Sequence, residues 1–445
     1  MAQAEAQRIT AEARVEAQRI TAEARVEAQR ITSVAQAAGR GDSEERNQHA
    51  HVNGRTLVAI FFQSELAAAT DGFADSHRIG GGGFGSVYHA TRLRGMGIVD
   101  LAIKKLDMAS MQGQREFLQE VQVLGACRHE TLIPLLGFAA DTGSIGASAN
   151  ADASAAVGVC LVTPLMKGGS LEDRLILDDS ARRRLMKLPG APVRGFEPLS
   201  WQQRLIVAED LVMGVLFLHT PNAALHKPMI LHRDIKPSNI LLDMDCHARL
   251  ADMGLARAQR PTAPHLTTMT SIAGTNGYLD EYYVTTGRFD EAADGYAVGV
   301  TMLALLKGSG AVDPDQGHII GQFEDLDDVS VVADTRVQWP REVVNGVHKV
   351  GMGLVKRNRA MRISLTAALE QLQQLVNTHI SPVSELQDLV ERECLQVVSV
   401  CAAPRALWVR TLCVVPRLCW TFHAACGACL SDLQTGSDPG GTGPE

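Results

Sequence analysis

The chain has 445 residues, of which 46% are hydrophobic and 21% are charged, and its formal net charge is −8. These proportions are typical of a soluble globular protein, long enough for one large two-lobed domain or for two to three smaller ones. The acidic balance argues against nucleic acid as a partner. No apolar run is long enough to be a transmembrane segment, and the start MAQAEAQRIT lacks the apolar region of a signal peptide. We therefore expect a cytoplasmic protein, which a partner could bring to a membrane.

The first 38 residues contain an internal repeat, in which EAQRITAEARV occurs twice and is followed by EAQRIT. A period of eleven residues is close to three helical turns, so we expect a repeat helix over residues 1–38. Its apolar stripe is mostly alanine, which makes the helix only weakly amphipathic. Residues 5–31 could support weak oligomerisation, or they could be a solvated helix that arose by repeat expansion. Residues 39–56, which are polar, are expected to be a linker.

Strand and helix patterns follow one another from Leu57 onward. SVYHATRL and DLAIKKL have the β-branched and aromatic composition of strands. SELAAAT, REFLQEVQVLGACRH and WQQRLIVAEDLVMGVLFLH have apolar residues at helical spacing, and further helical segments continue to about Gln373. Residues 139–157 and 176–198 are interpreted as polar surface insertions. Strands first and helices later predict an α+β fold with a small β-rich lobe and a larger α-helical lobe.

A glycine-rich stretch, IGGGGFGSVYHA, places Gly80, Gly82 and Gly85 at a spacing that has three interpretations. The three interpretations are a dinucleotide-binding turn, a phosphate-binding loop and a flexible linker. A Walker-type loop needs Gly-Lys-Ser/Thr, but Ser86 follows Gly85 directly. A dinucleotide site needs a helix at the third glycine, but Val87 and its neighbours have strand composition. The surroundings favour a hairpin whose backbone amides approach phosphate oxygens.

Segments further along the chain supply the charged groups that such a hairpin needs. Lys104 lies in LAIKKL, nineteen residues after Gly85, and Glu120 on the next predicted helix is a plausible ion-pair partner for it. ILHRDIKPSNILLD (230–243) and RLADMGLAR (249–257) come later. A glycine loop, a lysine, a helical glutamate, H-R-D-x-K-x-x-N and D-x-G in this order form the signature set of protein kinases.

The chain therefore resembles a eukaryotic-type protein kinase, with a two-lobed kinase fold over about residues 57–376 and a Cys-rich tail at 377–445. ELAAATDGFADSHRIGGGGFGSVYHA, GSLEDRL and GTNGYLDEYYVTTGRF are similar to segments of plant receptor-like kinases and of the Pelle and interleukin-receptor-associated group. The resemblance implies ATP-dependent transfer of the γ-phosphoryl group to serine or threonine hydroxyls of protein substrates, in signalling and with autophosphorylation. It also implies ATP with Mg²⁺ (or Mn²⁺) as cofactors and an upstream receptor as a partner.

Each matching residue receives a role from this resemblance. The residues expected to surround the nucleotide are Ile79, Gly80, Gly82, Phe84, Gly85, Val87, Ala102, Lys104, Pro164, Met166 and Leu241. Thr163 falls at the gatekeeper position, just before the hinge. A proline at 164 is tolerable there because the adenine would use its carbonyl, and proline lacks only the donor. Lys104 would contact the α- and β-phosphates, with Glu120 orienting it.

The catalytic loop and the residues that follow it receive the remaining roles. Asp234 would accept or orient the proton of the substrate hydroxyl, and Lys236 would stabilise the transferred phosphoryl group. Asn239 and Asp252 would hold the metal ion, because hard oxygen ligands suit Mg²⁺. Lys236 together with Thr275 is the pattern of the Ser/Thr-specific kinases rather than of the tyrosine kinases.

Two positions depart from the family's pattern. Met253 stands where a phenylalanine is usual, and we expect it to keep the same packing beneath the helix of Glu120. Relatives read G-Y-x-D-P-E-Y where this chain reads GYLDEYY, so Glu281 occupies the proline position and Tyr282 the glutamate position. In the relatives this glutamate pairs with an arginine near the end of the large lobe, which the resemblance places at Arg362. We expect that Glu281 swings to reach Arg362, or that this buried ion pair is lost.

Regulation and the competing hypotheses complete the prediction. Arg233 would dock a phosphorylated activation segment, and the candidate acceptors are Thr267, Thr268, Thr270 and Ser271. Asp294 would support the backbone of the HRD segment.

The alternatives to an active kinase are a pseudokinase scaffold and a helix-mediated interaction protein. In the tail, Cys426 and Cys429 could begin a metal or redox site, but no second CxxC accompanies them, so a loosely packed tail is expected.

Overall fold

The computed structural model of this chain describes residues 49–52, 55–82, 85–93, 98–106, 111–139, 159–225, 227–258, 267–268 and 272–380. Several expectations therefore lie outside the described residues. They are the repeat helix, most of the insertion at 139–157, the cysteine-rich tail beyond residue 380, and the side chains of Phe84, Thr270 and Ser271.

The small lobe contains a seven-stranded sheet in the order β1-β2-β6-β7-β5-β4-β3. Its strands are β1 (His49–Val52), β2 (Arg55–Ile60), β3 (Arg78–Gly82), β4 (Gly85–Arg92), β5 (Ile98–Leu106), β6 (Gly137–Ala139) and β7 (Val159–Pro164). All neighbours are antiparallel except β2 and β6, which are parallel. The expected linker at 39–56 was wrong from His49 onward, because β1 and the start of β2 extend the sheet beyond β6.

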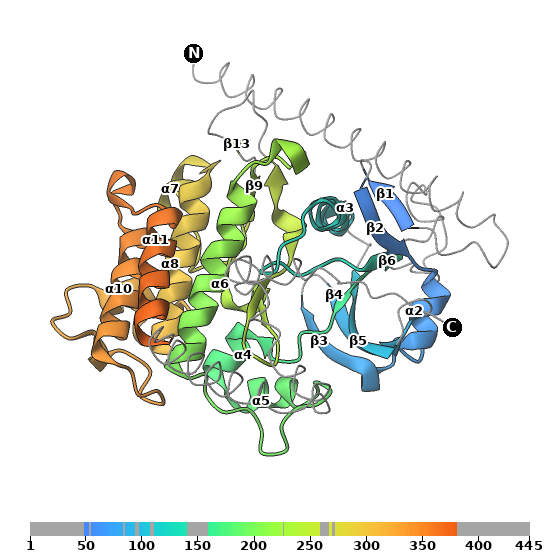
Figure 1. Cartoon of the computed structure of the whole chain (residues 1–445), viewed down its shortest axis with the longest axis horizontal. Helices are drawn as coiled ribbons and strands as arrows, with labels where there is room; N and C mark the ends of the chain where they lie inside the picture. The colour runs from blue at the N-terminus through green and yellow to red at the C-terminus, as the bar shows by residue number, and fades with distance from the viewer. Residues whose placement is uncertain are drawn as a thin grey trace, which may run out of the picture. The chain divides into compact units, whose positions relative to one another are not determined.

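Opposite faces of this sheet pack against different partners. The outer face is covered by α2 (Gln63–Ala69), whose Leu66 is fully buried in a cluster with Ile103 and Val162. The inner face packs against α3 (Met111–Ala126), which lies beside β2 in Figure 1. Phe117 of α3 contacts the ring of Phe138 edge-on at 5.9 Å between ring centroids. The helix that carries Glu120 is thus anchored by apolar packing on the sheet.

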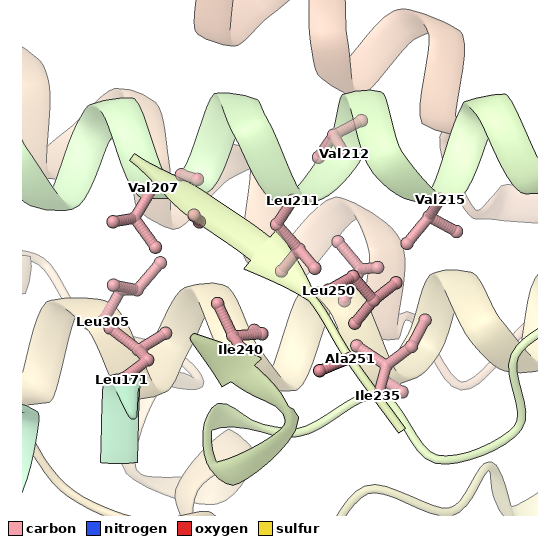
Figure 2. Close-up of a cluster of buried hydrophobic side chains, with 14 of the residues drawn as sticks. Leu171, Val207, Leu211, Val212, Val215, Ile235, Ile240, Leu250, Ala251 and Leu305 are labelled. Atoms are coloured by element: carbon pink, nitrogen blue, oxygen red, sulfur yellow. The ribbon is translucent and has the colours of Figure 1, made fainter. Parts of the chain in front are cut away.

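The large lobe is built on four long helices, α6 (Trp201–His219), α8 (Glu291–Lys307), α10 (Arg341–Val355) and α11 (Leu365–His379), seen together in Figure 1. The predicted helix at 201–219 is confirmed at both ends, and a capping box at Ser200 explains its start. This helix is buried on most sides, as its apolar sequence requires. Figure 2 shows Val207 and Leu211 on the side of α6 that faces Ile240 and Leu305.

Shorter elements connect these helices and carry most of the polar loops. The helices are α4 (Leu171–Ile176), α5 (Asp179–Leu185), α7 (Glu281–Thr286) and α9 (Ile319–Phe323). The strands are β8 (Gly169–Ser170), β9 (Ile230–Leu231), β10 (Ile240–Leu242), β11 (Ala248–Leu250), β12 (Arg257–Ala258), β13 (Thr267–Thr268), β14 (Arg288–Phe289), β15 (Val312–Asp313) and β16 (Gly317–His318). The order of a sheet-rich lobe followed by a helical lobe confirms the predicted α+β fold.

One predicted surface insertion has a small core of its own. Within residues 176–198, α5 buries Leu185 against Leu177 and Phe196. The guanidinium of Arg174, on α4, lies 4.8 Å from the centre of the Phe196 ring.

Among the helices of the described ranges, none combines the length and apolar character needed to cross a bilayer.

Candidate active site

Strand pairing places the predicted nucleotide-contacting residues of the sheet on one face. Val87 on β4 is opposite Lys104 on β5, and Ala102 on β5 is opposite Thr163 on β7. Directly opposed residues share a face, and so do residues two apart along one strand. Val87, Ala102, Lys104 and Thr163 therefore line a single surface that lies between the sheet and the large lobe.

The glycine-rich stretch forms a hairpin, because β3 and β4 pair from Gly82–Gly85 to Arg78–Tyr88. This geometry excludes the dinucleotide alternative, which required a helix at Gly85. Gly85 has φ +133°, and a Cβ at this position would lie 2.1 Å from the carbonyl oxygen of Lys105. Only glycine fits there, since both the backbone angle and the close approach exclude a side chain.

The hinge after β7 keeps its ladder to β5 despite the proline. The amide of Leu165 donates to the carbonyl of Asp100 at 3.0 Å, so the backbone N–H of Leu165 points toward β5. The nitrogen of Pro164 faces the opposite way, and the proline costs no hydrogen bond to β5. Met166 is buried in the main core, and Leu241 on β10 packs partly buried against the same core. These positions can form the edge and floor of an adenine site.

Lys104 makes two ion pairs that join the lobes. Its Nζ lies 2.9 Å from Oε2 of Glu120 on α3 and 2.9 Å from Oδ1 of Asp252. Burial by itself would lower the pKa of Lys104, but the two carboxylates raise it well above the usual range. Burial raises the pKa of Glu120, and Lys104 opposes that shift. The predicted Lys104–Glu120 pair is therefore present, and Asp252 is a second partner that the sequence did not indicate.

Around Asp234, a hydrogen-bonded group joins the catalytic-loop segment to Thr275. Thr275 Oγ1 donates to Asp234 Oδ1 at 2.7 Å, and Lys236 Nζ lies 2.9 Å from Asp234 Oδ2. Lys236 also donates to Thr275 Oγ1 at 2.7 Å. The structure thus brings together the residues whose combination predicted serine and threonine specificity.

Asn239 and Asp252 offer the oxygen donors that a divalent cation needs. The amide nitrogen of Asn239 donates to the backbone carbonyl of Asp234 at 2.8 Å and to its Oδ2 at 3.0 Å. The side-chain carbonyl of Asn239 therefore points away from Asp234 and remains an acceptor. Asp252 uses Oδ1 for Lys104, which leaves Oδ2 as a potential ligand. Hard oxygen donors of this kind fit a magnesium-type ion.

Asp294 on α8 fixes the backbone that carries these groups. Its carboxylate accepts from the amides of His232 at 2.8 Å and Arg233 at 2.9 Å, and from His219 Nε2 at 2.9 Å. Arg233 is held at φ +73°, a backbone angle that is strained for a residue with a side chain. Burial alone would raise the pKa of Asp294, but these hydrogen bonds and the nearby histidines hold it below the usual range.

Replacing Asp294 should destabilise the large lobe in a pH-dependent way. Asp294→Asn is expected to lower the free energy of unfolding at pH 7 by about 2–4 kcal/mol, because two buried amides share one weaker acceptor. The folded-state pKa is depressed, so the stabilisation is present above the unfolded-state pKa, about 3.9, and is lost as the pH falls through the folded value. Urea unfolding of both proteins at pH 7 and toward pH 3 measures this.

The exposed Asp315 provides the control, since Asp315→Asn should unfold like the wild type. A loss for Asp294→Asn that stays equal across the pH range would contradict the role of the ionised carboxylate.

The side chain of Arg233 is held by groups that sequence reasoning missed. Its Nη2 donates to the hydroxyl of Tyr283 at 3.1 Å, and its Nη1 to the carbonyl of Leu255 at 3.2 Å. Tyr283 is fully buried, and its hydroxyl also accepts from the amide of Ala273 at 2.9 Å. One feature of the sequence pointed to this role: Tyr283 matches the last tyrosine of the family's G-Y-x-D-P-E-Y pattern, although Glu281 and Tyr282 before it depart from that pattern.

Both expectations for the ion pair of Arg362 were wrong. Glu281 does not reach Arg362: it is exposed and lies 3.5 Å from Arg357. The pair is not lost either, because Asp280 occupies the partner position, with oxygens 2.7 and 2.9 Å from the two Nη atoms of Arg362. Asp280 precedes α7 directly, and its carboxylate both caps the first turn of this helix and accepts from Arg362.

Met253 packs as predicted. It is fully buried in the same core cluster as Phe117 and Val121 of α3. The next residue, Gly254, approaches α3 closely, since a Cβ there would lie 3.1 Å from that of Glu116. The segment after Asp252 therefore supports the helix of Glu120 without a phenylalanine.

Comparison with known proteins agrees with this geometry. A family model described as "Protein kinase domain" matches residues 73–373, which contain every site residue named above. The chain belongs to the protein kinase family. The match begins after β1, β2 and α2, so these elements are additions to the region that the family model covers.

Several plant kinases are similar to this chain. A probable serine/threonine-protein kinase PBL18 from Arabidopsis thaliana is 31% identical over 338 residues, covering 72% of this chain and 77% of that protein. Serine/threonine-protein kinase PBL13 is 33% identical, over 66% of this chain and 50% of its own length. Serine/threonine-protein kinase BRI1-like 2 is 36% identical, over 57% of this chain. The chain spans only 19% of the length of BRI1-like 2.

Proposed function

We propose that this protein is a serine/threonine protein kinase, which transfers the γ-phosphoryl group of ATP, with Mg²⁺, to hydroxyls of protein substrates. The observation that carries the proposal is the connected group of Asp234, Lys236 and Thr275. It lies in the same domain as the Lys104–Glu120–Asp252 group. The names of the relatives, which are serine/threonine kinases, support the same conclusion.

Each residue has a role that follows from its partners. Both carboxylate oxygens of Asp234 act as hydrogen-bond acceptors, Oδ1 from Thr275 and Oδ2 from Asn239. The same carboxylate can accept the proton of an incoming hydroxyl. Lys236 would place a positive charge next to the transferred group, and Lys104 would hold the other phosphates. Asn239 and Asp252 would bind the metal ion, which when bound neutralises phosphate charge.

The alternative of a pseudokinase is not favoured, because none of these side chains is missing and they meet at hydrogen-bonding distances. The direct test is a phosphorylation assay with radiolabelled ATP and generic protein substrates, followed by phosphoamino-acid analysis. We expect phosphoserine and phosphothreonine. The absence of labelled product with several substrates, or labelling of tyrosine alone, would contradict the proposal.

Autophosphorylation of the activation segment is part of the proposal. Arg233 is buried next to Asp234, and its Nε has no hydrogen-bond acceptor within the described part of the chain. A buried cation with an unused donor suits a phosphate that docks from this segment. The backbone of Thr267 and Thr268 forms β13, which pairs with β14.

Replacing the four candidate acceptors together tests this mechanism. Alanine at Thr267, Thr268, Thr270 and Ser271 is expected to remove phosphate from the segment. It should lower kcat at least about tenfold, since charge-assisted hydrogen bonds contribute roughly 1.5–3 kcal/mol each. Mass spectrometry and steady-state kinetics measure the two effects, with Ser330→Ala, an exposed serine, as the control. Unchanged phosphate incorporation and activity would rule the mechanism out.

Partners and location are proposals of the same kind. We infer protein substrates, an upstream receptor and a cytoplasmic location, with membrane association through a partner. Weak oligomerisation through residues 5–31 would add a second function. Comparing the solution mass of the full chain with that of a variant lacking residues 1–38 separates oligomerisation from a solvated helix.

A further inference from the structure

Asp280 is bound to Arg362 in a geometry that restrains both side chains. The two N–O distances, 2.7 and 2.9 Å, belong to parallel hydrogen bonds of a bidentate pair. Both side chains are buried, with 1% of Asp280 and 6% of Arg362 exposed. The remaining donors of Arg362 bind the carbonyl of Lys356 at 2.8 Å and that of Ala292 at 3.3 Å. The guanidinium is therefore fixed to the large lobe by several bonds, and it holds Asp280 in place.

Two neighbouring residues, Tyr282 and Arg359, also contact Asp280 or each other. Asp280 accepts from the amide of Tyr282 at 3.2 Å and thereby begins α7. Arg359 contributes a second cation, 3.4 Å from Oδ2 of Asp280. The ring of Tyr282 lies 4.1 Å from the guanidinium of Arg359. The tyrosine that replaces the family's glutamate thus stacks on an arginine and leaves Arg362 to Asp280.

A short path leads from this pair to the proposed phosphoryl-transfer site. The amide of Tyr278 donates to the carbonyl of Thr275 at 3.1 Å, which closes a tight turn over residues 275–278, and Asp280 follows two residues after this turn. At the other end of this turn, Thr275 Oγ1 donates to Asp234. Leu279 closes the turn against Gly274, where an added Cβ would lie 2.7 Å from Leu279 Cδ2. The position of Asp280 therefore constrains where the hydroxyl of Thr275 lies.

We propose that Asp280 is a positioning residue for phosphoryl transfer: bound to Arg362, it holds the segment in which Thr275 contacts Asp234 and Lys236. This inference rests on the proposed kinase function. Asp280 takes over the task that a glutamate two residues later has in the family's pattern. The nucleotide side of the site depends on different contacts, those of Lys104 with Glu120 and Asp252. Asp280 should therefore affect turnover and protein-substrate binding, and not ATP binding.

The experiment compares Asp280→Asn with Glu281→Gln in the full chain. Asp280→Asn is expected to lower kcat by about 10- to 100-fold, with the KM for ATP within about twofold of the wild type, because one buried charge pair is broken. Glu281→Gln is the matched control: it removes the neighbouring, exposed carboxylate and should leave kcat unchanged. If Glu281→Gln lowered kcat and Asp280→Asn did not, the inference would be wrong.

A double-mutant cycle with Arg362→Met tests whether the two residues act as a pair. The double variant should be no slower than the slower single variant, whereas additive losses would contradict a shared role. Arg362→Lys, which keeps the charge and loses the two parallel bonds, serves if Asp280→Asn does not fold. An intermediate kcat is expected for it, and a wild-type kcat would overturn the inference.

Hydrogen exchange separates this inference from the proposed function. Amides of residues 272–287 should exchange faster in Asp280→Asn than in the wild type, while those of α3 should not change. This readout requires no activity, so it remains decisive if the wild type fails to phosphorylate any substrate. Failure of the wild type in the assay would refute the kinase proposal alone. Unchanged exchange over residues 272–287 would refute the role of Asp280 alone.

Discussion

Asp234→Asn is expected to lower kcat by about 10²- to 10⁴-fold, the range that general acid–base groups contribute. The asparagine keeps the shape of the side chain, so Thr275 and Asn239 retain a partner of similar size. It removes the negative charge that pairs with Lys236 at 2.9 Å and that, in the proposed mechanism, accepts the proton of the substrate hydroxyl. The KM for ATP should change little, because Asp234 does not contact the Lys104 group.

Steady-state phosphorylation of a protein substrate measures this effect, and nucleotide binding is followed separately by titration with ADP. Asp245→Asn, an exposed aspartate in the turn between β10 and β11, is the control and should match the wild type. A residual kcat within about threefold of the wild type would show that Asp234 has no role in proton transfer.

Lys104→Met is the second large effect. It should lower kcat/KM for ATP by about 10²- to 10³-fold, because the cation that bridges Glu120 and Asp252 is removed and, in the proposed mechanism, phosphate loses its partner. The variant should also be less stable by about 1–3 kcal/mol at pH 7, since buried Glu120 keeps its charge without a partner. The loss of stability should shrink as the pH falls, because protonation of Glu120 removes the unpaired charge.

Lys105 provides a closely matched control for this experiment. It neighbours Lys104 on β5, faces the opposite side of the sheet and lies 4.4 Å from the ring of Phe73. Lys105→Met should retain kcat/KM for ATP within about threefold. Equal losses in the two variants would mean that the effect is a general one on the sheet and not one on phosphate binding.

Much of the site could be predicted from the sequence because its residues lie in short, locally defined segments. The spacing from Asp234 to Asn239 places both on one loop, and the alternation of β5 fixes the face of Lys104. Such local relations do not depend on how distant parts of the chain meet. The helix at 201–219 was predictable for the same reason, since its capping box and its periodicity are both local.

Other features depended on contacts between distant segments. Position-by-position matching left Glu281 as the expected partner of Arg362, or no partner at all, but the carboxylate that reaches Arg362 is decided by where α7 begins. Likewise, the D-x-G motif predicted a metal-binding role for Asp252, but nothing in the sequence indicated its pair with Lys104, 148 residues away. The strands at His49–Val52 and Arg55–Ile60 are recognisable only by their pairing with β6 and with each other.

These two added strands have a consequence for how the domain is delimited. The amides of Ala59 and Phe61 donate to the carbonyls of Leu136 and Phe138, and Val58 is buried against α3, where it lies 3.6 Å from a Cβ built on Gly125. A fragment that began at residue 73, where the family match starts, would expose the edge of β6 as a row of unpaired carbonyl groups beside an apolar strip. Exposed edges of this kind pair with other chains. The smallest unit that protects its own sheet therefore begins before the motifs by which the family is recognised.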